Sequence, residues 1–372
     1  TMKRRCILAS GVALSHALDC LADMNADLDV IPVSMPYPLN TEALSRALQP
    51  YEDVLVIEET YPVIELQAGF CRKVRGRHDG FIPGAGELTP DLIFQAIRRF
   101  IGMPDDLPRP SEAPGRRPTL CPGCPHRPVF YALRKTFPRA VYPSDIGCYT
   151  LGLNLGAVDT VLGMGAAVSL AEGLYHSFTM AGKEVPQIAA TIGDSTFYHA
   201  GVPALINAVH HRARFVLVVL DNSTTAMTGY QPTMGSALLP DGNPAQPVAL
   251  ENLIQGCGVR FVRTIDPYDL KNLTKLLKEA GEFSLSPDGG VAVVVARRPC
   301  IMNRSARRID RAYRMEVTEE CTACGHCVER FECPALSLHD GDSAVTIDPV
   351  LCTGCGVCVE VCPVGALVAR EP

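Results

Sequence analysis

The sequence of 372 residues contains no apolar run of the roughly 18 residues that a membrane-spanning helix needs, so a transmembrane protein is not expected. It also lacks an excess of basic residues. The 34 lysines and arginines against 40 acidic residues give a net charge of −6, which disfavours nucleic-acid binding. A secretory signal is not predicted, because Ser10, Ser15 and His16 interrupt the first apolar stretch and acidic residues follow at Asp19 and Asp23.

Cysteine, by contrast, is abundant. Of the 16 cysteines, eight fall between Cys321 and Cys362, in a dense C-x-x-C array rather than a scattered disulfide pattern. Thiolate arrays of this kind belong in reducing surroundings, so we expect a cytoplasmic, oxygen-sensitive protein. Four other cysteines lack partner spacing and are predicted to be small core residues: Cys6, Cys20, Cys71 and Cys257.

Strand and helix patterns divide the chain into three parts and two linkers. Residues 1–107 alternate strand and helix signals and predict a small α/β domain. Residues 108–118, which end a proline-rich stretch, predict a linker. Residues 119–300 contain apolar strands separated by helices, which predicts a doubly wound parallel sheet that binds ligands at the carboxyl ends of its strands. An arginine-rich linker over 301–314 and a cysteine-rich tail over 315–372 complete the chain.

In the first domain, we expect a strand over residues 6–9, followed by a helix with the apolar stripe Leu14, Leu18, Leu21 and Met24. Further strands are predicted in "DVIPVSM" and "DVLVIEE", and in the second domain in "QIAATIGD", "RFVLVVLDN", "RFVRTID" and "VAVVVAR".

Seven arginines lie between Arg297 and Arg314, across the second linker. Charge runs are usually solvated, so a plain linker is the simpler interpretation. The alternative is a docking surface for an acidic electron carrier or for phosphates.

The tail contains two cysteine motifs, "CTACGHCVERFECP" and "CTGCGVCVEVCP". In such motifs three thiolates of one loop hold three corners of an iron–sulfur cube, and the fourth ligand comes from the other motif. The predicted ligand sets of two [4Fe-4S] clusters are Cys321, Cys324, Cys327 and Cys362, and Cys352, Cys355, Cys358 and Cys333. Zinc is the alternative, but the interleaved sets with C-P endings fit iron–sulfur better. The tail resembles a two-cluster bacterial-type ferredoxin.

Oxygen ligands follow two strands of the second domain, in "IGDSTFYHAG" and "LDNSTTAMTG". Gly193 permits a tight turn, Asp194 offers a carboxylate, and Asn222 offers an amide oxygen. Together with the backbone carbonyl of Thr224, they suit a Mg²⁺ ion that also binds a diphosphate. The amides around Ser195 can receive phosphate oxygens. The plain alternative is an Asp and an Asn at the strand ends of an ordinary doubly wound sheet.

These two segments resemble the thiamine diphosphate motif, G-D-G followed some thirty residues later by Asn. Gly193 and Asn222 are 29 positions apart, and Ser195 replaces the third glycine. Together with "LCPGCPHR", "SDIGCYTLG" and "MGAAVSLAEGL", they resemble the 2-oxoacid:ferredoxin oxidoreductases, in particular the large subunits of the indolepyruvate type. The resemblance implies a transketolase-C-like first domain, a thiamine-diphosphate-binding second domain and a ferredoxin-like α+β tail.

The resemblance implies oxidative decarboxylation of an aryl 2-oxoacid, such as indolepyruvate, to an acyl-CoA and CO₂. Thiamine diphosphate, Mg²⁺ and [4Fe-4S] clusters would be the cofactors, and coenzyme A the co-substrate. A small gamma-like (beta) subunit and ferredoxin, or another redox acceptor, would be partners. In this family a pyrimidine domain supplies the Glu that activates the cofactor, and that domain precedes the segment where this sequence begins. We therefore expect a separate pyrimidine-domain subunit, unless the sequence is a fragment.

Two other functions stay open. The chain could be a non-catalytic electron-transfer subunit with a vestigial thiamine fold. It could also belong to a sister enzyme that acts on phenylglyoxylate or an aliphatic 2-oxoacid.

A third [4Fe-4S] cluster is implied by analogy with related oxidoreductases. Cys121 and Cys124 form C-P-G-C, Cys148 matches the third ligand by its surroundings, and Cys300 is the candidate for the fourth. Two alternatives compete for the C-P-G-C segment: a thioredoxin-like redox pair, or a zinc site that includes His126.

The resemblance places further residues near the cofactor: Tyr149, Met164, Gly165, Thr225 and Thr228. A structural role in their loops is the alternative for each of them. His126 could approach substrate or coenzyme A, or it could stabilise a turn. His210 and His211 are expected to face solvent or to interact with a helix dipole.

Overall fold

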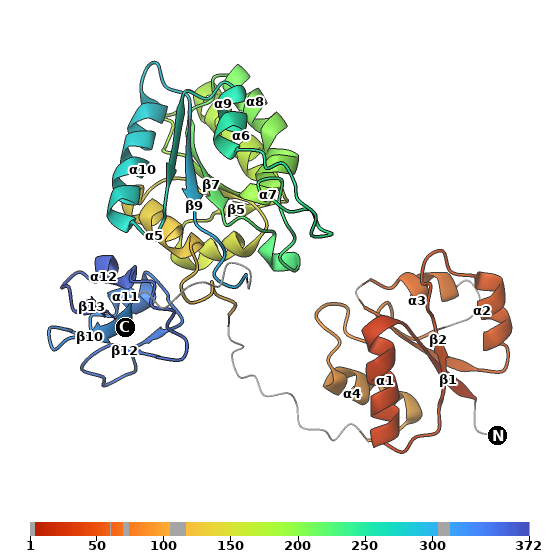
Figure 1. The fold of residues 1–372 in the computed structure, drawn as a ribbon. Coiled ribbons are helices and arrows are strands. Elements are labelled where there is room, and N and C mark those ends of the chain that lie inside the picture. Colours follow the sequence, from red (N-terminus) through yellow and green to blue (C-terminus); the bar gives the residue numbers. More distant parts are fainter. Residues whose placement is uncertain (1–3, 60, 70–73, 105–116, 304–312, 372) are drawn as a thin grey trace. The chain divides into compact units, whose positions relative to one another are not determined.

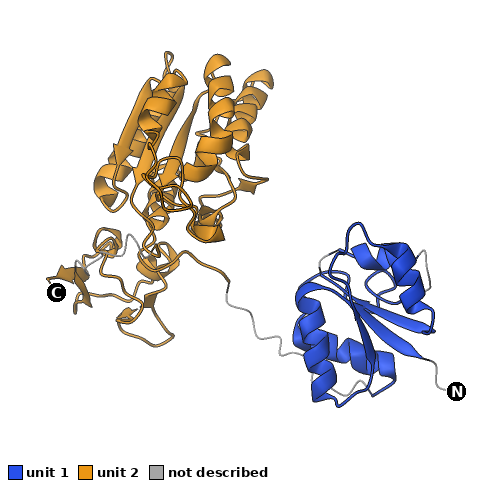
Figure 2. Ribbon diagram, turned by 45° about the vertical axis from the view of Figure 1, so that its right-hand side comes forward, with its two compact units in different colours: residues 1–115 blue, residues 116–372 orange. Residues whose placement is uncertain are grey.

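The computed structural model describes residues 4–59, 61–69, 74–104, 117–303 and 313–371. The chain divides into two compact units, residues 1–115 and 116–372 (Figure 2). The predicted core residue Cys71 lies outside the described residues, as do most of the two expected linkers. Among the described residues, no helix combines the length and apolar character that a membrane span requires.

The first unit is built on a three-stranded parallel sheet in the order β2-β1-β3 (Figure 1). Its elements are β1 (Arg5–Ala9), α1 (Gly11–Asp23), β2 (Asp29–Pro32), α2 (Thr41–Leu48), β3 (Asp53–Ile57), α3 (Val63–Ala68) and α4 (Pro90–Ile101). Alternate residues of β1 enter two cores: Ile7 packs with α1 and α4, and Leu8 packs with α2 and α3. Burial on both faces explains why the strand is continuously apolar.

The expected stripe on α1 is wrong at one position. Leu18 is 49% exposed, whereas the helix buries the predicted Leu21 together with Ala13, Ala17 and Cys20. These small residues lie in the core that α1 shares with α4, which packs against it.

The second unit contains a six-stranded, all-parallel sheet in the order β5-β4-β6-β7-β9-β8, as predicted for residues 119–300. Its strands are β4 (Pro143–Ser144), β5 (Thr160–Val161), β6 (Ala189–Gly193), β7 (Phe215–Asp221), β8 (Phe261–Ile265) and β9 (Val291–Arg297). The four longer strands match the four predicted ones. The two-residue strands β4 and β5 carry too little pattern to be found from sequence.

Helices cover both faces of this sheet. They are α5 (His126–Thr136), α6 (Ala166–Met180), α7 (Asp194–Thr196), α8 (Val202–His210), α9 (Leu250–Gly256) and α10 (Leu270–Leu285), with short helical turns over 148–155, 197–201 and 226–228. Helices α5 and α10 share one core with the sheet, and α6, α8 and α9 share the other. The strand order changes direction between β4 and β6, which is where doubly wound folds bind ligands.

The cysteine-rich tail folds into two small antiparallel pairs, β10 with β13 and β11 with β12. Its elements are β10 (Arg314–Val317), α11 (His326–Glu329), β11 (Leu336–Ser337), β12 (Thr346–Ile347), α12 (Cys358–Val361) and β13 (Leu367–Arg370). Apolar residues of the tail, including Phe331 and Val357, belong to the same core as α5 and α10. The tail is therefore part of the second unit.

Candidate functional site

A pocket lies at the carboxyl ends of β6 and β7, next to the switch point of the sheet. Its lining includes Asp194, Ser195, Asn222 and Thr224, the residues predicted to receive Mg²⁺ and a diphosphate. Asp194, Asn222 and Thr224 are each more than 90% buried. Parallel strands bring these polar groups together because their carboxyl ends share one edge of the sheet.

Asp194 has an unpartnered oxygen in this pocket. Its Oδ2 atom is buried and makes no hydrogen bond within the described structure. Burial, followed by the neighbouring Asp221, raises the pKa of this carboxyl above its ordinary value. An unpaired buried carboxylate is costly, and a cation would satisfy it. The residues therefore fit the predicted divalent ion.

Asp221, which the sequence analysis missed, supplies a second carboxylate behind Asp194. It pairs with Arg297, whose Nε lies 2.6 Å from Oδ2, and Arg297 also contacts Glu251 at 2.8 Å. Asp221 and Arg297 are register partners on β7 and β9. Only the strand pairing reveals this link, because 76 residues separate the two in sequence.

The backbone at Gly193 approaches the ring of Tyr149. A Cβ atom at position 193 would lie 2.6 Å from Cε1 of Tyr149. The Tyr149 hydroxyl donates to the carbonyl of Ile146 at 3.1 Å and lies 3.3 Å from the Thr196 hydroxyl. Tyr149 thus packs beneath the turn that presents Asp194, and the glycine is required by this contact rather than by its backbone angles.

We expect Gly193→Ala to destabilise the chain by about 1–3 kcal/mol, because the added methyl group overlaps the Tyr149 ring. Chemical denaturation of the isolated chain measures the effect. Gly173→Ala is the matched control, since a Cβ there meets nothing within 4 Å, and it should be neutral or stabilising. Equal losses in both variants would contradict the close contact.

Two loops of the pocket are tied together by a hydroxyl pair. Thr225 Oγ1 donates to Ser195 Oγ at 2.8 Å. Met164, 52% exposed, also lines the pocket. Thr228 bonds to Gln231 at 2.6 Å, at the pocket's rim.

Asp145 is a second residue that sequence reasoning missed. It follows β4, and its carboxylate accepts the backbone N–H of Gly165 at 2.9 Å and of Ala166 at 3.1 Å, at the start of α6. Gly165 has φ +91°, a left-handed conformation that favours glycine. Burial raises the pKa of Asp145 to about 6. The acidic residue in "SDIGC" was the available signal.

His126 lies in the pocket rather than in a zinc site with Cys121 and Cys124. Its Nε2 atom is 3.3 Å from Nδ2 of Asn222, and its ring packs edge-to-face on Tyr149. Burial lowers the pKa of His126 to about 4, so the imidazole is neutral near pH 7 and can accept a hydrogen bond from the Asn222 amide. This contact orients the amide at the predicted metal site.

The structure brings Cys121, Cys124, Cys148 and Cys300 together beside the pocket. Burial raises the pKa of Cys121 and Cys148, and the nearby Cys300 raises both further. The pKa of Cys124 rises to about 12, chiefly through burial, with Cys121 and Cys148 as neighbours. Cys148 lines the pocket, and the N–H of Cys300 donates to the carbonyl of Asn222 at 3.0 Å.

The tail cysteines form the two predicted groups. Burial raises the pKa of Cys327 to about 11, and Cys362, Cys324 and Cys321 add to the shift. The pKa of Cys358 is raised by burial and by the second set of neighbours, Cys355, Cys333 and Cys352. Each group therefore joins three cysteines of one motif with the last cysteine of the other.

The sulfur atoms of these groups are not gathered as they would be around a single zinc ion. Thiolates around one tetrahedral zinc ion lie about 3.8 Å apart. Within the described ranges, no three cysteine sulfurs lie within 4.8 Å of one another. The donor set of each group, four thiolates from two C-x-x-C motifs, suits an iron–sulfur cube.

Arg127 connects the C-P-G-C segment to the tail. Its side chain is almost fully buried and donates to the carbonyls of Leu120 and Cys121 on one side and of Phe331 and Glu332 on the other. Arg127 therefore lies between the cysteine group next to the pocket and the tail group that includes Cys333.

Tyr268 makes a second connection. Its hydroxyl donates to the carbonyl of Gly123, and its ring lies 3.7 Å from the Arg298 guanidinium. Burial raises the pKa of Tyr268, with further contributions from Cys355 and Cys124, which places its hydroxyl near both cysteine groups. The pocket, the C-P-G-C segment and the second tail motif are thus contiguous.

Family comparisons agree with this organisation. Residues 145–296 match the family "Thiamine pyrophosphate enzyme, C-terminal TPP binding domain", and residues 345–368 match "4Fe-4S binding domain". The first match contains the pocket at Asp194, and the second contains the cysteines from Cys352 to Cys362.

Curated relatives match nearly the whole chain. The indolepyruvate oxidoreductase subunit IorA of Archaeoglobus fulgidus is 40% identical over 96% of this chain and 58% of its own length. IorA of Pyrococcus abyssi is 38% identical over 97% of this chain and 59% of its own length. The chain thus spans about three fifths of these relatives. A solved 2-oxoglutarate:ferredoxin oxidoreductase from Magnetococcus marinus is 21% identical, with a TM-score of 0.41 over 52% of this chain and 69% of that one.

The pocket, the paired tail motifs and the extent of sequence identity lead to one assignment: over the part of those proteins that it spans, the chain is a homologue of the indolepyruvate oxidoreductase subunit IorA, with a thiamine-pyrophosphate-binding domain followed by a 4Fe-4S domain.

Proposed function

We propose that the chain is the cofactor- and cluster-bearing part of a thiamine-dependent 2-oxoacid:ferredoxin oxidoreductase. It would oxidatively decarboxylate an aryl 2-oxoacid, such as indolepyruvate, to an acyl-CoA and CO₂. The main support is the unpartnered carboxylate oxygen of Asp194 in a pocket that a cysteine group adjoins. Such a reaction needs a cofactor site for decarboxylation and a neighbouring group that removes electrons. The pocket at Asp194 and the cysteine group beside it would meet these two needs.

The proposed metal ligands are Asp194, Asn222 and the carbonyl of Thr224. Bound thiamine diphosphate would supply the nucleophile and the electron sink for decarboxylation. The chain's own residues would bind and orient it: the amides around Ser195 would take phosphate oxygens, and neutral His126 would hold the Asn222 amide in place.

The proposed clusters use the three cysteine groups described above. Cys148 lines the pocket, so the group of Cys121, Cys124, Cys148 and Cys300 would take electrons first. Arg127 and Tyr268 lie between this group and Cys333 and Cys355, so Cys333, Cys352, Cys355 and Cys358 would hold the next cluster. Cys321, Cys324, Cys327 and Cys362 would hold the last one, next to the external acceptor.

We expect Cys148→Ser and Cys300→Ser each to lower the iron content of the anaerobically prepared chain by about four atoms. The tail clusters should remain, because their cysteines belong to separate groups. Iron analysis and electron paramagnetic resonance measure the change. Cys257→Ser is the control and should leave the iron content unchanged, because Cys257 lies outside the three cysteine groups. Full iron content in Cys300→Ser would remove that residue from the ligand set.

The partners are also proposed from the resemblance. A pyrimidine-domain subunit would carry the activating Glu, a small gamma-like (beta) subunit would complete the complex, and ferredoxin or another redox acceptor would take the electrons. Residues 1–107 would be a transketolase-C-like domain. A cytoplasmic location remains a prediction from the cysteine usage.

The native complex tests the whole proposal under anaerobic conditions. Indolepyruvate, phenylpyruvate, phenylglyoxylate or pyruvate is added with coenzyme A, and the visible absorbance of the clusters is followed. Bleaching that requires both coenzyme A and one 2-oxoacid would identify the reaction and its substrate. No bleaching with any of them, from a fully loaded complex, would favour the electron-transfer subunit with a vestigial thiamine fold.

A further inference from the structure

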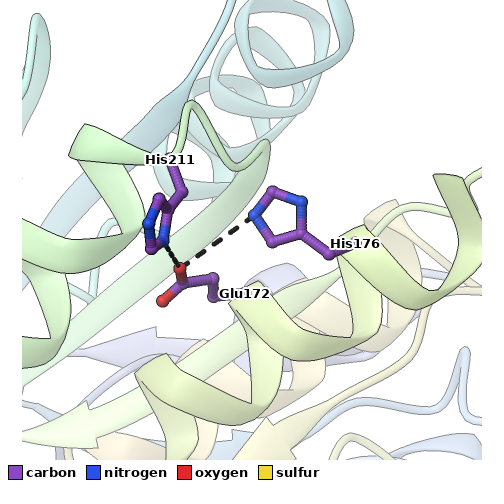
Figure 3. A group of neighbouring side chains, drawn as sticks. All are labelled: Glu172, His176 and His211. Atoms are coloured by element: carbon purple, nitrogen blue, oxygen red, sulfur yellow. Dashed lines mark hydrogen bonds and ion pairs between the residues drawn. The ribbon is translucent and has the colours of Figure 1, made fainter. Parts of the chain in front are cut away.

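A separate group of metal-binding side chains lies on the outer side of the thiamine-pyrophosphate-binding domain. Glu172 and His176 are four residues apart on α6, which places them on the same face of the helix. His211 directly follows α8, and its ring and that of His176 both turn toward the Glu172 carboxylate (Figure 3). We propose that Glu172, His176 and His211 form a zinc site that links α6 to α8.

The three ligand atoms already converge. His211 Nδ1 lies 2.7 Å from Oε1 of Glu172, His176 Nε2 lies 4.0 Å from the same oxygen, and all three atoms lie within 4.8 Å of one another. Ligand atoms around a tetrahedral zinc ion are about 3.3–3.5 Å apart. The observed distances lie on both sides of this value, so small side-chain rotations suffice to admit the ion. His211 would bind as the tautomer with its proton on Nε2.

Two features point to a ligand at this position. First, the Nε2 atom of His176 is buried and has no hydrogen-bond partner in the described structure. Second, the Glu172 side chain is about nine-tenths buried, and Nδ2 of Asn207 donates to both of its oxygens, at 2.8 and 2.9 Å. Hydrogen bonds from an outer residue to a ligating carboxylate are typical of built metal sites.

The donor set favours zinc over magnesium and calcium. Two imidazole nitrogens and one carboxylate oxygen suit zinc, whereas magnesium and calcium prefer oxygen ligands alone. The side chains of His176 and His211 are 36% and 50% exposed, so water can take the fourth position. Both helices pack on the same face of the sheet, and a shared ion would fix their contact. None of the three residues lines the thiamine pocket, so this site is independent of the proposed Mg²⁺ ion.

The test uses the full chain with its iron–sulfur clusters loaded, because zinc would otherwise bind the cysteines. The protein is equilibrated anaerobically with zinc at buffered free concentrations, and bound zinc is measured by mass spectrometry. About one zinc ion per chain is expected. His176→Gln and His211→Gln should each weaken zinc binding at least tenfold, because loss of a ligand exceeds the effect of losing an outer partner.

His210→Gln is the matched control. His210 is adjacent to His211 and the centroids of the two rings lie 5.3 Å apart, but His210 is not in the ligand group, so zinc binding should persist. Hydrogen exchange gives a second readout: zinc should slow exchange in α6 and α8 in the unsubstituted chain and not in His211→Gln. Circular dichroism and cluster absorbance establish that each variant is folded. Failure of the unsubstituted chain to bind zinc, or equal binding by the His176→Gln/His211→Gln double variant, would overturn the proposal.

Discussion

Asp194→Asn is expected to lower the 2-oxoacid-dependent reduction of the clusters in the native complex by more than about 100-fold. The substitution replaces the proposed anionic metal ligand, and loss even of an outer partner typically costs 10–100-fold in metal affinity or activity. The same substitution should not lower the stability of the cofactor-free chain. The Oδ2 atom of Asp194 is buried and unpartnered, so removing the charge should stabilise the cofactor-free chain at pH values above the raised pKa of Asp194, where the unsubstituted carboxyl is ionised.

The stability of the cofactor-free chain and its affinity for Mg²⁺ and thiamine diphosphate should change with pH in opposite directions. The raised pKa means that the folded cofactor-free chain holds this proton more tightly than the unfolded chain. The stability of the cofactor-free chain should therefore fall as pH rises from the ordinary value of 3.8 through the folded pKa. Metal binding needs the carboxylate, so affinity for Mg²⁺ and thiamine diphosphate should rise over the same window. Thermal unfolding with and without the cofactor measures both trends.

Glu282→Gln is the control for Asp194→Asn. Glu282 is exposed on α10 and pairs only loosely with Lys278, at 3.9 Å. Its substitution should therefore change neither the reduction of the clusters nor the stability of the cofactor-free chain. Normal turnover by Asp194→Asn in a loaded complex would mean that the carboxylate has no role in cofactor binding. That result would support the vestigial thiamine fold.

Arg127→Met is expected to destabilise the second unit by about 3–5 kcal/mol, because it removes a buried charge whose partners stay buried. The carbonyls of Leu120, Phe331 and Glu332 would lose their donor. Since these carbonyls belong to the C-P-G-C segment and to the tail, the tail should detach at lower denaturant concentration than the sheet domain. Denaturation followed separately by cluster absorbance and by far-ultraviolet circular dichroism would reveal the two steps.

Arg117→Gln is a matched control for Arg127→Met, because Arg117 also contacts Glu332. Its side chain is 66% exposed, so its loss should change stability by no more than about 1 kcal/mol. Arg127→Lys should behave more like Arg127→Met than like the unsubstituted chain, since lysine lacks the planar fork that reaches several carbonyls. A single transition at unchanged denaturant concentration in Arg127→Met would show that the guanidinium does not hold the tail in place.

Local patterns were sufficient for the main elements of both units. The strands of "RFVLVVLDN" and "VAVVVAR" are long, continuously apolar and buried on both faces, so their residue types alone identify them. Helix α2 also begins at a local signal, because the Asn40 side chain accepts the backbone N–H of Ala43 and caps its first turn. Leu18 shows the limit of this reasoning, because helical periodicity does not reveal which face a neighbouring helix will cover.

The sequence alone determined which residues are candidates for metal and cofactor binding, because such binding needs particular donors at short, fixed spacings. This is why the C-x-x-C motifs and the Asp194 to Asn222 pair were visible without a structure. Only the tertiary structure decided which distant residues meet. It joined Asp221 to Arg297, His126 to Asn222, Arg127 to the tail, and His211 to Glu172. These contacts depend on strand register and on packing between elements, which local sequence patterns do not encode.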